Sequence, residues 1–316
     1  MRDNIDTGLE RRPPHLGLED APRPEWVDLP ERSNTLAMHI IARLALTLGR
    51  PAARSLLYPI CLYFLIFSFK TRASSTKYLR KILSREPSFA DTFRHYHTFA
   101  ATLLDRVFLM DDQFSRFDVC VHDEDILTDM ATRGEGCILL GAHMGSFEII
   151  GALGRRKTGT KISFVMYEEN ARKLNSVLNA INPAHPLKVI SLGKFDSMLK
   201  VESALNQGEF IGMLGDRTLQ SEGSVACQFL GEQARFPSGP IHVAAILKRP
   251  IVLMFGLYRG DNRYDIYFER LIDTWHMPTL THDLLLKRTL HRYVERVAHY
   301  CHDAPYNWNN FYDFWQ

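Results

Sequence analysis

The sequence predicts an α/β fold: a single domain with a mixed, mostly parallel central sheet covered by helices, preceded by an N-terminal helical membrane-association region. After residue 110, short apolar runs rich in β-branched and aromatic residues alternate with amphipathic stretches. Strands that alternate with helices in this way indicate a sheet covered on both faces. The chain has 316 residues, 46% hydrophobic and 23% charged, which suits an ordinary globular protein.

The first 110 residues differ in composition from the rest. Residues 1–30 hold four arginines, seven acidic residues and five prolines, so we expect a mobile segment without the pattern of a cleaved signal peptide. Residues 31–110 hold twelve basic and four acidic residues and include the apolar run LLYPICLYFLIFSF at residues 56–69. A bilayer-spanning helix needs about 20 apolar residues, so this run is short. A buried core helix remains open, but we favour a helix at the membrane surface, because cationic flanks bind anionic lipid.

Residues 111–316 form the predicted α/β core. Apolar runs bounded by Gly, Asn, Asp or Pro predict six strands, at residues 136–140, 161–166, 187–190, 210–214, 251–257 and 264–271. Apolar residues spaced three and four apart predict helices at residues 146–153, 169–180, 196–206, 240–247 and 281–301. Ligands of such sheets bind at the carboxyl ends of the strands, so the turn after each strand is a candidate site.

The turn after the first of these strands reads GAHMGSFE, with His143 on the turn and Glu148 in the following helix. In that arrangement the imidazole can fold back onto the carboxylate. A carboxylate on one ring nitrogen fixes the tautomer and leaves the other nitrogen free to take a proton from a hydroxyl. The alternative is that His143 caps the helix and Glu148 pairs with a surface base.

Two later turns carry polar residues at strand or helix ends. Asp216 and Arg217 follow the strand at 210–214, and Arg217 is expected either to clamp a phosphate or to form a structural ion pair with Asp216. Ser238 and Gly239 precede Pro240 at the start of an apolar helix. Free backbone N–H groups there suit an anion or an oxyanion, although a plain helix start would look the same.

Several classes of protein are disfavoured. A formal charge of +2 argues against nucleic acid as the partner, and five scattered cysteines without a Cys-x-x-Cys pair argue against disulfides or structural zinc. The phosphate-binding loop, the dinucleotide fingerprint and the serine-hydrolase elbow are all missing from the sequence. His95 and His97 are expected on solvated helix faces rather than on a metal. We therefore expect no metal site, and neither NTP hydrolysis nor dinucleotide binding.

The ordered motifs resemble the late acyltransferases of lipid A biosynthesis, within the lysophospholipid acyltransferase superfamily. The resemblance runs from about Trp26 to Trp315. It rests on Trp26 and Glu31, the arginine-flanked apolar run, STKYL at residues 75–79, GAHMGSFE, QFLGEQARFPSGP, and APYNWNNFYDFW with Pro305, Trp308 and Phe311. GAHMGSFE matches the superfamily's His-x4-Asp/Glu signature.

The resemblance implies transfer of a fatty acyl chain from acyl-carrier protein, or from acyl-CoA, to a hydroxyl of a membrane lipid or glycolipid. His143 would be the general base and Glu148 its orienting carboxylate, with no covalent acyl-enzyme and no cofactor. The implied place is the cytoplasmic face of the bacterial inner membrane, peripheral or shallowly inserted. Asp216-Arg217 departs from the Asp-Gln or Asp-His pair of the family, so the acceptor stays open. A non-catalytic lipid-binding or scaffold protein of the same fold is the alternative.

Overall fold

The computed structural model describes residues 43–157, 161–167, 188–192, 196–217, 223–275 and 281–315. The predicted mobile segment at residues 1–30, the predicted helix at 169–180, and Trp26 and Glu31 lie outside these residues.

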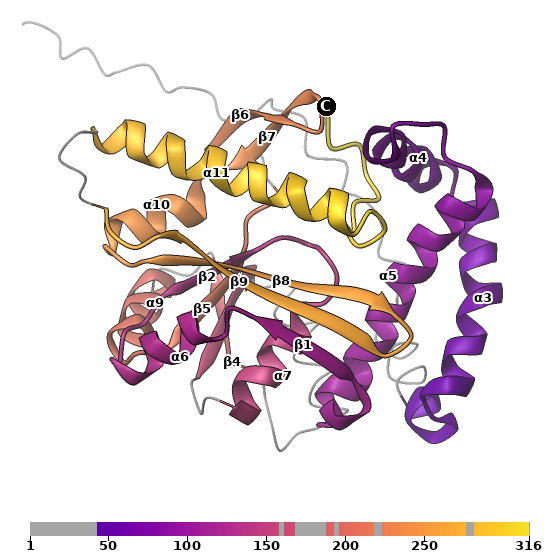
Figure 1. The fold of residues 1–316 in the computed structure, drawn as a ribbon, viewed down its shortest axis with the longest axis horizontal. Coiled ribbons are helices and arrows are strands. Elements are labelled where there is room, and N and C mark those ends of the chain that lie inside the picture. Colours follow the sequence, from indigo (N-terminus) through magenta and orange to yellow (C-terminus); the bar gives the residue numbers. More distant parts are fainter. Residues whose placement is uncertain are drawn as a thin grey trace, which may run out of the picture.

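A seven-stranded sheet forms the centre of the molecule (Figure 1). Its strand order is β1-β9-β8-β2-β5-β3-β4, and every neighbouring pair is parallel except β8 with β9. The strands are β1 (Asp118–His122), β2 (Ile138–Gly141), β3 (Ile162–Tyr167), β4 (Lys188–Leu192), β5 (Phe210–Leu214), β8 (Ile251–Gly260) and β9 (Arg263–Ile272). A separate antiparallel hairpin joins β6 (Ser224–Phe229) to β7 (Glu232–Pro237). The predicted mixed, mostly parallel sheet is therefore confirmed.

Side chains alternate between the two faces of the central strands, and each face has its own core. On β2, Ile138 and Leu140 face α9 (Ser197–Asn206), α10 (Gly239–Ile246), α11 (His282–Asp303) and the hairpin. Leu139, between them, faces α5 (Phe89–Met110), α6 (Asp125–Thr132) and α7 (Glu148–Lys157). Strands buried on both faces are rich in apolar residues, which explains why most of them could be found from the sequence.

Helices α3 (Arg50–Phe67) and α4 (Phe69–Leu83) precede α5 and lie beside it at one side of the sheet (Figure 1). The apolar run at residues 56–69 covers α3 from Leu56 to its end and reaches the first residue of α4. The two helices are separated by Ser68 and meet at a bend of 97°. Among the described residues no single helix is long and apolar enough to cross a membrane, although α3 and α4 satisfy the same criteria jointly as a bent pair.

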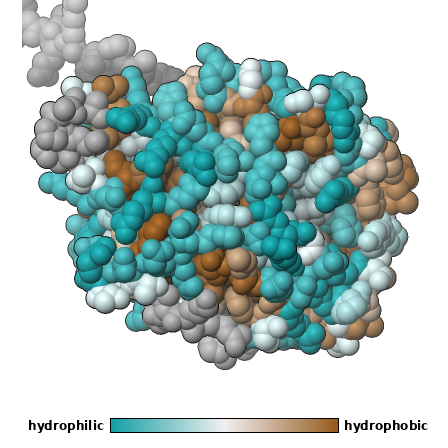
Figure 2. All heavy atoms as spheres, in the orientation of Figure 1, coloured by the Kyte–Doolittle hydropathy of each residue, from teal (hydrophilic) through white to brown (hydrophobic). Residues whose placement is uncertain are grey.

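The outer face of α3 is apolar and exposed. Its exposed side chains are Leu56, Tyr58, Ile60, Leu62, Tyr63, Phe64, Ile66 and Phe67, with Phe69 following the bend. Figure 2 shows hydrophobic residues at the right-hand edge of the molecule, where Figure 1 places α3. A contiguous exposed patch of this kind is uncommon on soluble proteins.

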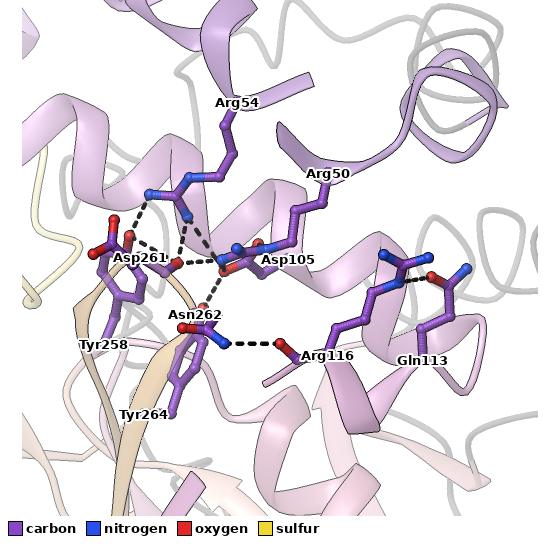
Figure 3. A network of polar contacts seen from close by, with 9 residues as sticks. All are labelled: Arg50, Arg54, Asp105, Gln113, Arg116, Tyr258, Asp261, Asn262 and Tyr264. Carbon is purple, nitrogen blue, oxygen red and sulfur yellow. Dashed lines mark hydrogen bonds and ion pairs between the residues drawn. The ribbon is translucent and has the colours of Figure 1, made fainter. Parts of the chain in front are cut away.

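Arginines at the start of α3 attach it to the core (Figure 3). Arg50 donates to both carboxylate oxygens of buried Asp105 on α5, at 2.7 and 2.8 Å, and Tyr264 Oη donates to the same group at 2.9 Å. Arg50 and Arg54 also donate to the carbonyl of Asp261, in the turn between β8 and β9. The ion pair with Asp105 raises the pKa of Arg50 despite the opposing effect of burial.

The structure adds elements that the sequence pattern did not predict. Strand β1 and the hairpin strands β6 and β7 were not expected, and the short helix Phe114–Arg116 was also missed. The six predicted strands and the predicted helices within the described residues are confirmed, with ends displaced by a few residues.

Candidate active site

The chain makes a tight turn between β2 and α7, and His143 lies on it. Met144 N donates to the carbonyl of Ala142 at 2.7 Å, and Ser146 N donates to the carbonyl of Gly256 on β8 at 2.9 Å. Gly145 has φ +58°, and a Cβ atom there would lie 2.0 Å from the oxygen of Gly256. Only glycine fits this conformation and this approach, so β8 fixes the path of the turn.

His143 is held by Asp216, which follows β5. Since β2 and β5 pair with Gly141 opposite Leu214, the residues two places further along each chain also meet. Asp216 Oδ1 accepts from the backbone N of His143 at 3.0 Å and lies 2.7 Å from Nδ1 of the same residue. Asp216 Oδ2 accepts from Trp308 Nε1 at 3.0 Å.

The charges in the site favour a neutral imidazole beside an ionised carboxylate. Burial alone would raise the pKa of Asp216, but His143, Arg217 and the Trp308 hydrogen bond outweigh it and lower the pKa to about 2. Burial and the charge of Arg217 lower the pKa of His143 below 6.5, against the opposing effect of Asp216. An ionised carboxylate only accepts hydrogen bonds, so Nδ1 carries the proton and Nε2 has a free lone pair. The His143 side chain is 31% exposed, so solvent reaches the residue.

The expected contact between His143 and Glu148 is not formed, and this prediction is wrong. Glu148 is buried at the start of α7, where Oε2 accepts from Ser146 Oγ at 3.0 Å and Oε1 lies 2.6 Å from Nε of Arg106 on α5. Glu148 therefore pairs with Arg106 on another helix, and Asp216, which follows the adjacent strand β5, contacts His143 instead. The charge of Glu148 still contributes to raising the pKa of His143.

Arg217 contacts the C-terminal part of the chain. Its Nη2 donates to the carbonyl of Asn309 at 2.9 Å, and its guanidinium lies 5.6 Å from the ring centre of Tyr312. The expected alternative of a structural ion pair with Asp216 is not formed, because the Asp216 carboxylate faces His143 and Trp308. Whether Arg217 binds phosphate stays a prediction.

Ser238 and Gly239 lie where β7 passes into α10. Ser238 Oγ and its backbone N both donate to the carbonyl of Gly223 at 3.1 Å, and Gly239 is the first residue of α10. No hydrogen bond joins either residue to His143 or Asp216 within the described part of the chain. The contacts of His143 therefore do not test the predicted role of Ser238 and Gly239 at a substrate oxyanion, which stays a prediction.

Three buried residues lie behind the site, and their contacts with it were not predicted from the sequence. Trp308 donates to Asp216, Asn307 hydrogen-bonds the backbone of Tyr258 on β8, and His95 Nε2 lies 2.8 Å from the carbonyl of Trp308. The expectation that His95 lies on a solvated helix face is wrong, since the residue is fully buried. The family-like ending APYNWNNFYDFW marked this segment, but nothing local in the sequence indicated its partners.

One group of possible metal ligands occurs among the described residues, Cys120, His122 and Asp265, with ligand atoms within 4.8 Å of one another. It lies on β1 and β9, separated from β2 by β8. Asp265 is already paired with Arg259 at 2.8 Å, so its carboxylate has a cationic partner without a metal. Among the residues that the structure describes, no hydrogen bond or ion pair joins this group to His143.

Comparison with known proteins decides the family. The model of the bacterial lipid A biosynthesis acyltransferases matches residues 26–275, which is most of the chain and includes β2, His143, Glu148 and Asp216. The chain belongs to this family. No curated protein matches the sequence significantly.

Membership of this family makes the protein an acyltransferase, and it implies an acyl donor and a lipid acceptor. The site geometry agrees with that class, because acyl transfer to a hydroxyl needs a base. A neutral histidine with a fixed tautomer and a free ring nitrogen can supply one. The family match ends at residue 275, before Trp308.

Proposed function

We propose that this acyltransferase moves a fatty acyl chain from a thioester, carried by acyl-carrier protein or coenzyme A, to a hydroxyl of a membrane lipid or glycolipid. His143 is the general base and Asp216 is the carboxylate that orients it. The observation that carries the proposal is the 2.7 Å contact between Asp216 Oδ1 and His143 Nδ1 on an imidazole that is partly open to solvent.

In the proposed reaction the acceptor hydroxyl attacks the thioester directly, without a covalent acyl-enzyme. The acceptor hydroxyl gives its proton to His143 Nε2 while its oxygen forms a bond to the thioester carbonyl carbon. The tetrahedral intermediate then collapses, the C–S bond breaks, and His143 returns the proton to the leaving thiolate. Asp216 stabilises the imidazolium that exists between the two proton transfers. General base catalysis of this kind contributes about 10²- to 10⁴-fold to the rate.

Glu148 acts in this proposal through Arg106. Its carboxylate is buried and holds the guanidinium at 2.6 Å, while the Arg106 side chain stays 33% exposed. Arg106 is a positioning or binding group for the anionic parts of donor or acceptor, and Glu148 fixes its place. A bidentate guanidinium suits phosphate or carboxylate.

The cytoplasmic face of the bacterial inner membrane is the proposed place of action. The support is the exposed apolar face of α3 together with the basic excess of residues 31–110. An amphipathic helix with cationic neighbours binds at the headgroup boundary. Peripheral or shallow attachment would bring lipid substrates to the site without a spanning segment.

Acyl transfer by the wild type, His143→Ala and Asp216→Asn tests the proposal. Each protein is incubated with acyl-carrier protein and coenzyme A thioesters over a bacterial lipid extract, and acylated lipid is measured by mass spectrometry. We expect transfer by the wild type and a loss of at least about 10²-fold in both variants. Equal transfer by His143→Ala would refute the base mechanism. Lipid binding without any transfer would favour the non-catalytic alternative.

A further inference from the structure

The part of the chain that follows α11 crosses the catalytic turn. Residues 305–311 lie beyond the region that the family model matches, yet Gly145 N donates to the carbonyl of Asn307 at 2.8 Å and Asn309 N donates to the carbonyl of His143 at 2.7 Å. Met144 and Trp308 pair as an antiparallel bridge. The backbone of the His143 turn is therefore hydrogen-bonded on the side of this segment as well as on the side of β8.

We propose that the C-terminal segment 305–311 is part of the catalytic centre, and that Trp308 is a positioning residue that holds Asp216 against His143. The inference rests on the proposed role of His143 and Asp216 and names a further residue on which that role depends.

The Asp216 carboxylate is fixed by three donors. Oδ1 takes the backbone N–H and the Nδ1–H of His143, and Oδ2 takes the indole N–H of Trp308. Two donors on one oxygen still allow the carboxylate to tilt about that oxygen, whereas a third donor on the other oxygen fixes its plane. Both Asp216 and Trp308 are 1% exposed, so water is not at hand to replace the indole.

Hydrogen bonds behind Trp308 hold it in turn. A carbonyl only accepts, so His95 Nε2 must carry the proton that binds the carbonyl of Trp308 at 2.8 Å. His95 Nδ1 then accepts from Ser75 Oγ at 2.8 Å. Burial lowers the pKa of His95 to about 4, which keeps the ring neutral as this pattern requires. The chain of contacts thus runs from α4 through α5 and Trp308 to Asp216 and His143.

Packing alone does not account for a tryptophan at this position. The Trp308 ring packs against Tyr78, Phe229 and Phe314, with ring centres 5.0, 5.3 and 4.9 Å away, and phenylalanine could fill most of the same space. Phenylalanine lacks the ring N–H that Trp308 donates to Asp216 Oδ2. Trp308→Phe therefore removes the donor and keeps most of the aromatic contacts.

The test compares Trp308→Phe with a control, Trp275→Phe, whose indole donates to the carbonyl of Arg249 at 2.7 Å, away from the site. We expect kcat to fall about 10- to 100-fold in Trp308→Phe, which corresponds to the loss of one hydrogen bond to a charged group. KM for both substrates should stay within about twofold. The control should keep wild-type kcat.

A double-variant cycle separates positioning from a structural role. If Trp308 acts through Asp216, Trp308→Phe should cost little more in an Asp216→Asn background, because the two effects are not additive for residues in one network. Equal losses in both backgrounds, or wild-type kcat in Trp308→Phe, would overturn the proposal.

A measurement that does not use activity keeps the inference separate from the proposed reaction. In ¹⁵N-labelled protein, Asp216→Asn should shift the indole N–H resonance of Trp308, which is assigned by its disappearance in Trp308→Phe, and should leave that of Trp275 in place. An unshifted Trp308 resonance would overturn the contact itself. If the Trp308 resonance shifts but the His143→Ala variant still transfers acyl groups normally, the contact stands and the proposed function is refuted.

Discussion

Asp216→Asn against Glu148→Gln distinguishes the observed partner of His143 from the one that the sequence suggested. In Asp216→Asn either orientation of the amide leaves a mismatch. With the amide oxygen towards His143, the NH₂ group faces the indole N–H of Trp308, donor against donor. With the amide reversed, NH₂ faces His143 Nδ1, which must then lose its proton, and Nε2 becomes a donor that cannot act as a base.

The magnitude follows from the role of the base. Loss of general base catalysis lowers the rate by about 10²- to 10⁴-fold, or about 3 to 5 kcal/mol of barrier. Glu148→Gln keeps the Ser146 contact and leaves His143 Nδ1 unchanged. It removes the charge that holds Arg106 and that helps to raise the pKa of His143, but it leaves the Asp216 contact in place. We therefore expect a smaller loss than in Asp216→Asn, of about 10-fold, or about 1.4 kcal/mol of barrier.

The pH dependence gives a second sign to check. The base must be neutral, so kcat/KM of the wild type should rise with pH through a pKa below 6.5 and be level at neutral pH. Asp216 favours the imidazolium and so raises the pKa of His143. Its neutralisation should therefore move the acid limb of the profile to lower pH. The assay measures the initial rate of thiol release over pH 5–9 at a fixed lipid concentration. A larger loss of kcat/KM in Glu148→Gln than in Asp216→Asn would refute the assignment of Asp216 as the partner of His143. An acid limb that moves to higher pH in Asp216→Asn would refute it as well.

Three further substitutions test the scaffold. Asp105→Asn should lower the free energy of unfolding in urea by about 3 kcal/mol, because removing one partner of a buried ion pair leaves the other uncompensated. Phe67→Ser with Phe69→Ser should weaken binding to anionic vesicles at least about tenfold in sedimentation, since each buried phenylalanine contributes about 1.5 to 3 kcal/mol. Gly145→Ala should abolish most acyl transfer and lower Tm, because the added methyl group meets a backbone oxygen and the residue has positive φ.

Controls for these variants come from the same chain. Glu86→Gln removes the partner of Arg80 in an exposed ion pair and should leave the unfolding transition in place. Ile246→Ser changes an exposed apolar side chain on α10, away from α3, and should leave vesicle binding unchanged. An equal loss of vesicle binding in Ile246→Ser would remove α3 as the membrane contact, and a Gly145→Ala protein with full activity would contradict the tight approach to β8.

The sequence predicted those parts of the molecule that depend on local pattern. Strands such as β5 and β8 are buried on both faces and therefore read as apolar runs. Strand β1 was missed because none of its residues is fully buried, so it lacks the apolar run that marked the other strands. The hairpin was missed because β6 is buried on one face only, with Cys227 and Phe229 buried and Ala226 and Gln228 exposed, so it does not form the apolar run that marked the other strands.

The site divides in the same way. The turn with His143 followed from the glycines around it, but the partner of His143 depends on β2 lying next to β5, and strand order has no local signature. Glu148 was favoured because it is close in sequence, although Arg106 from α5 takes its carboxylate. Trp308 lies more than 90 residues from Asp216 along the chain, so only the three-dimensional structure brings them together.

The contacts of Arg50 and Arg54 fix the position of α3 relative to the core. Arg50 and Arg54 bind the first turns of the helix to α5 and to the β8–β9 turn. The aromatic C-terminal end of α3 therefore projects from a helix whose N-terminal end is fixed. With α3 resting in a leaflet, its depth would set the height of His143 above the lipid headgroups. The size of a lipid headgroup would then determine whether its hydroxyl lies within reach of the imidazole.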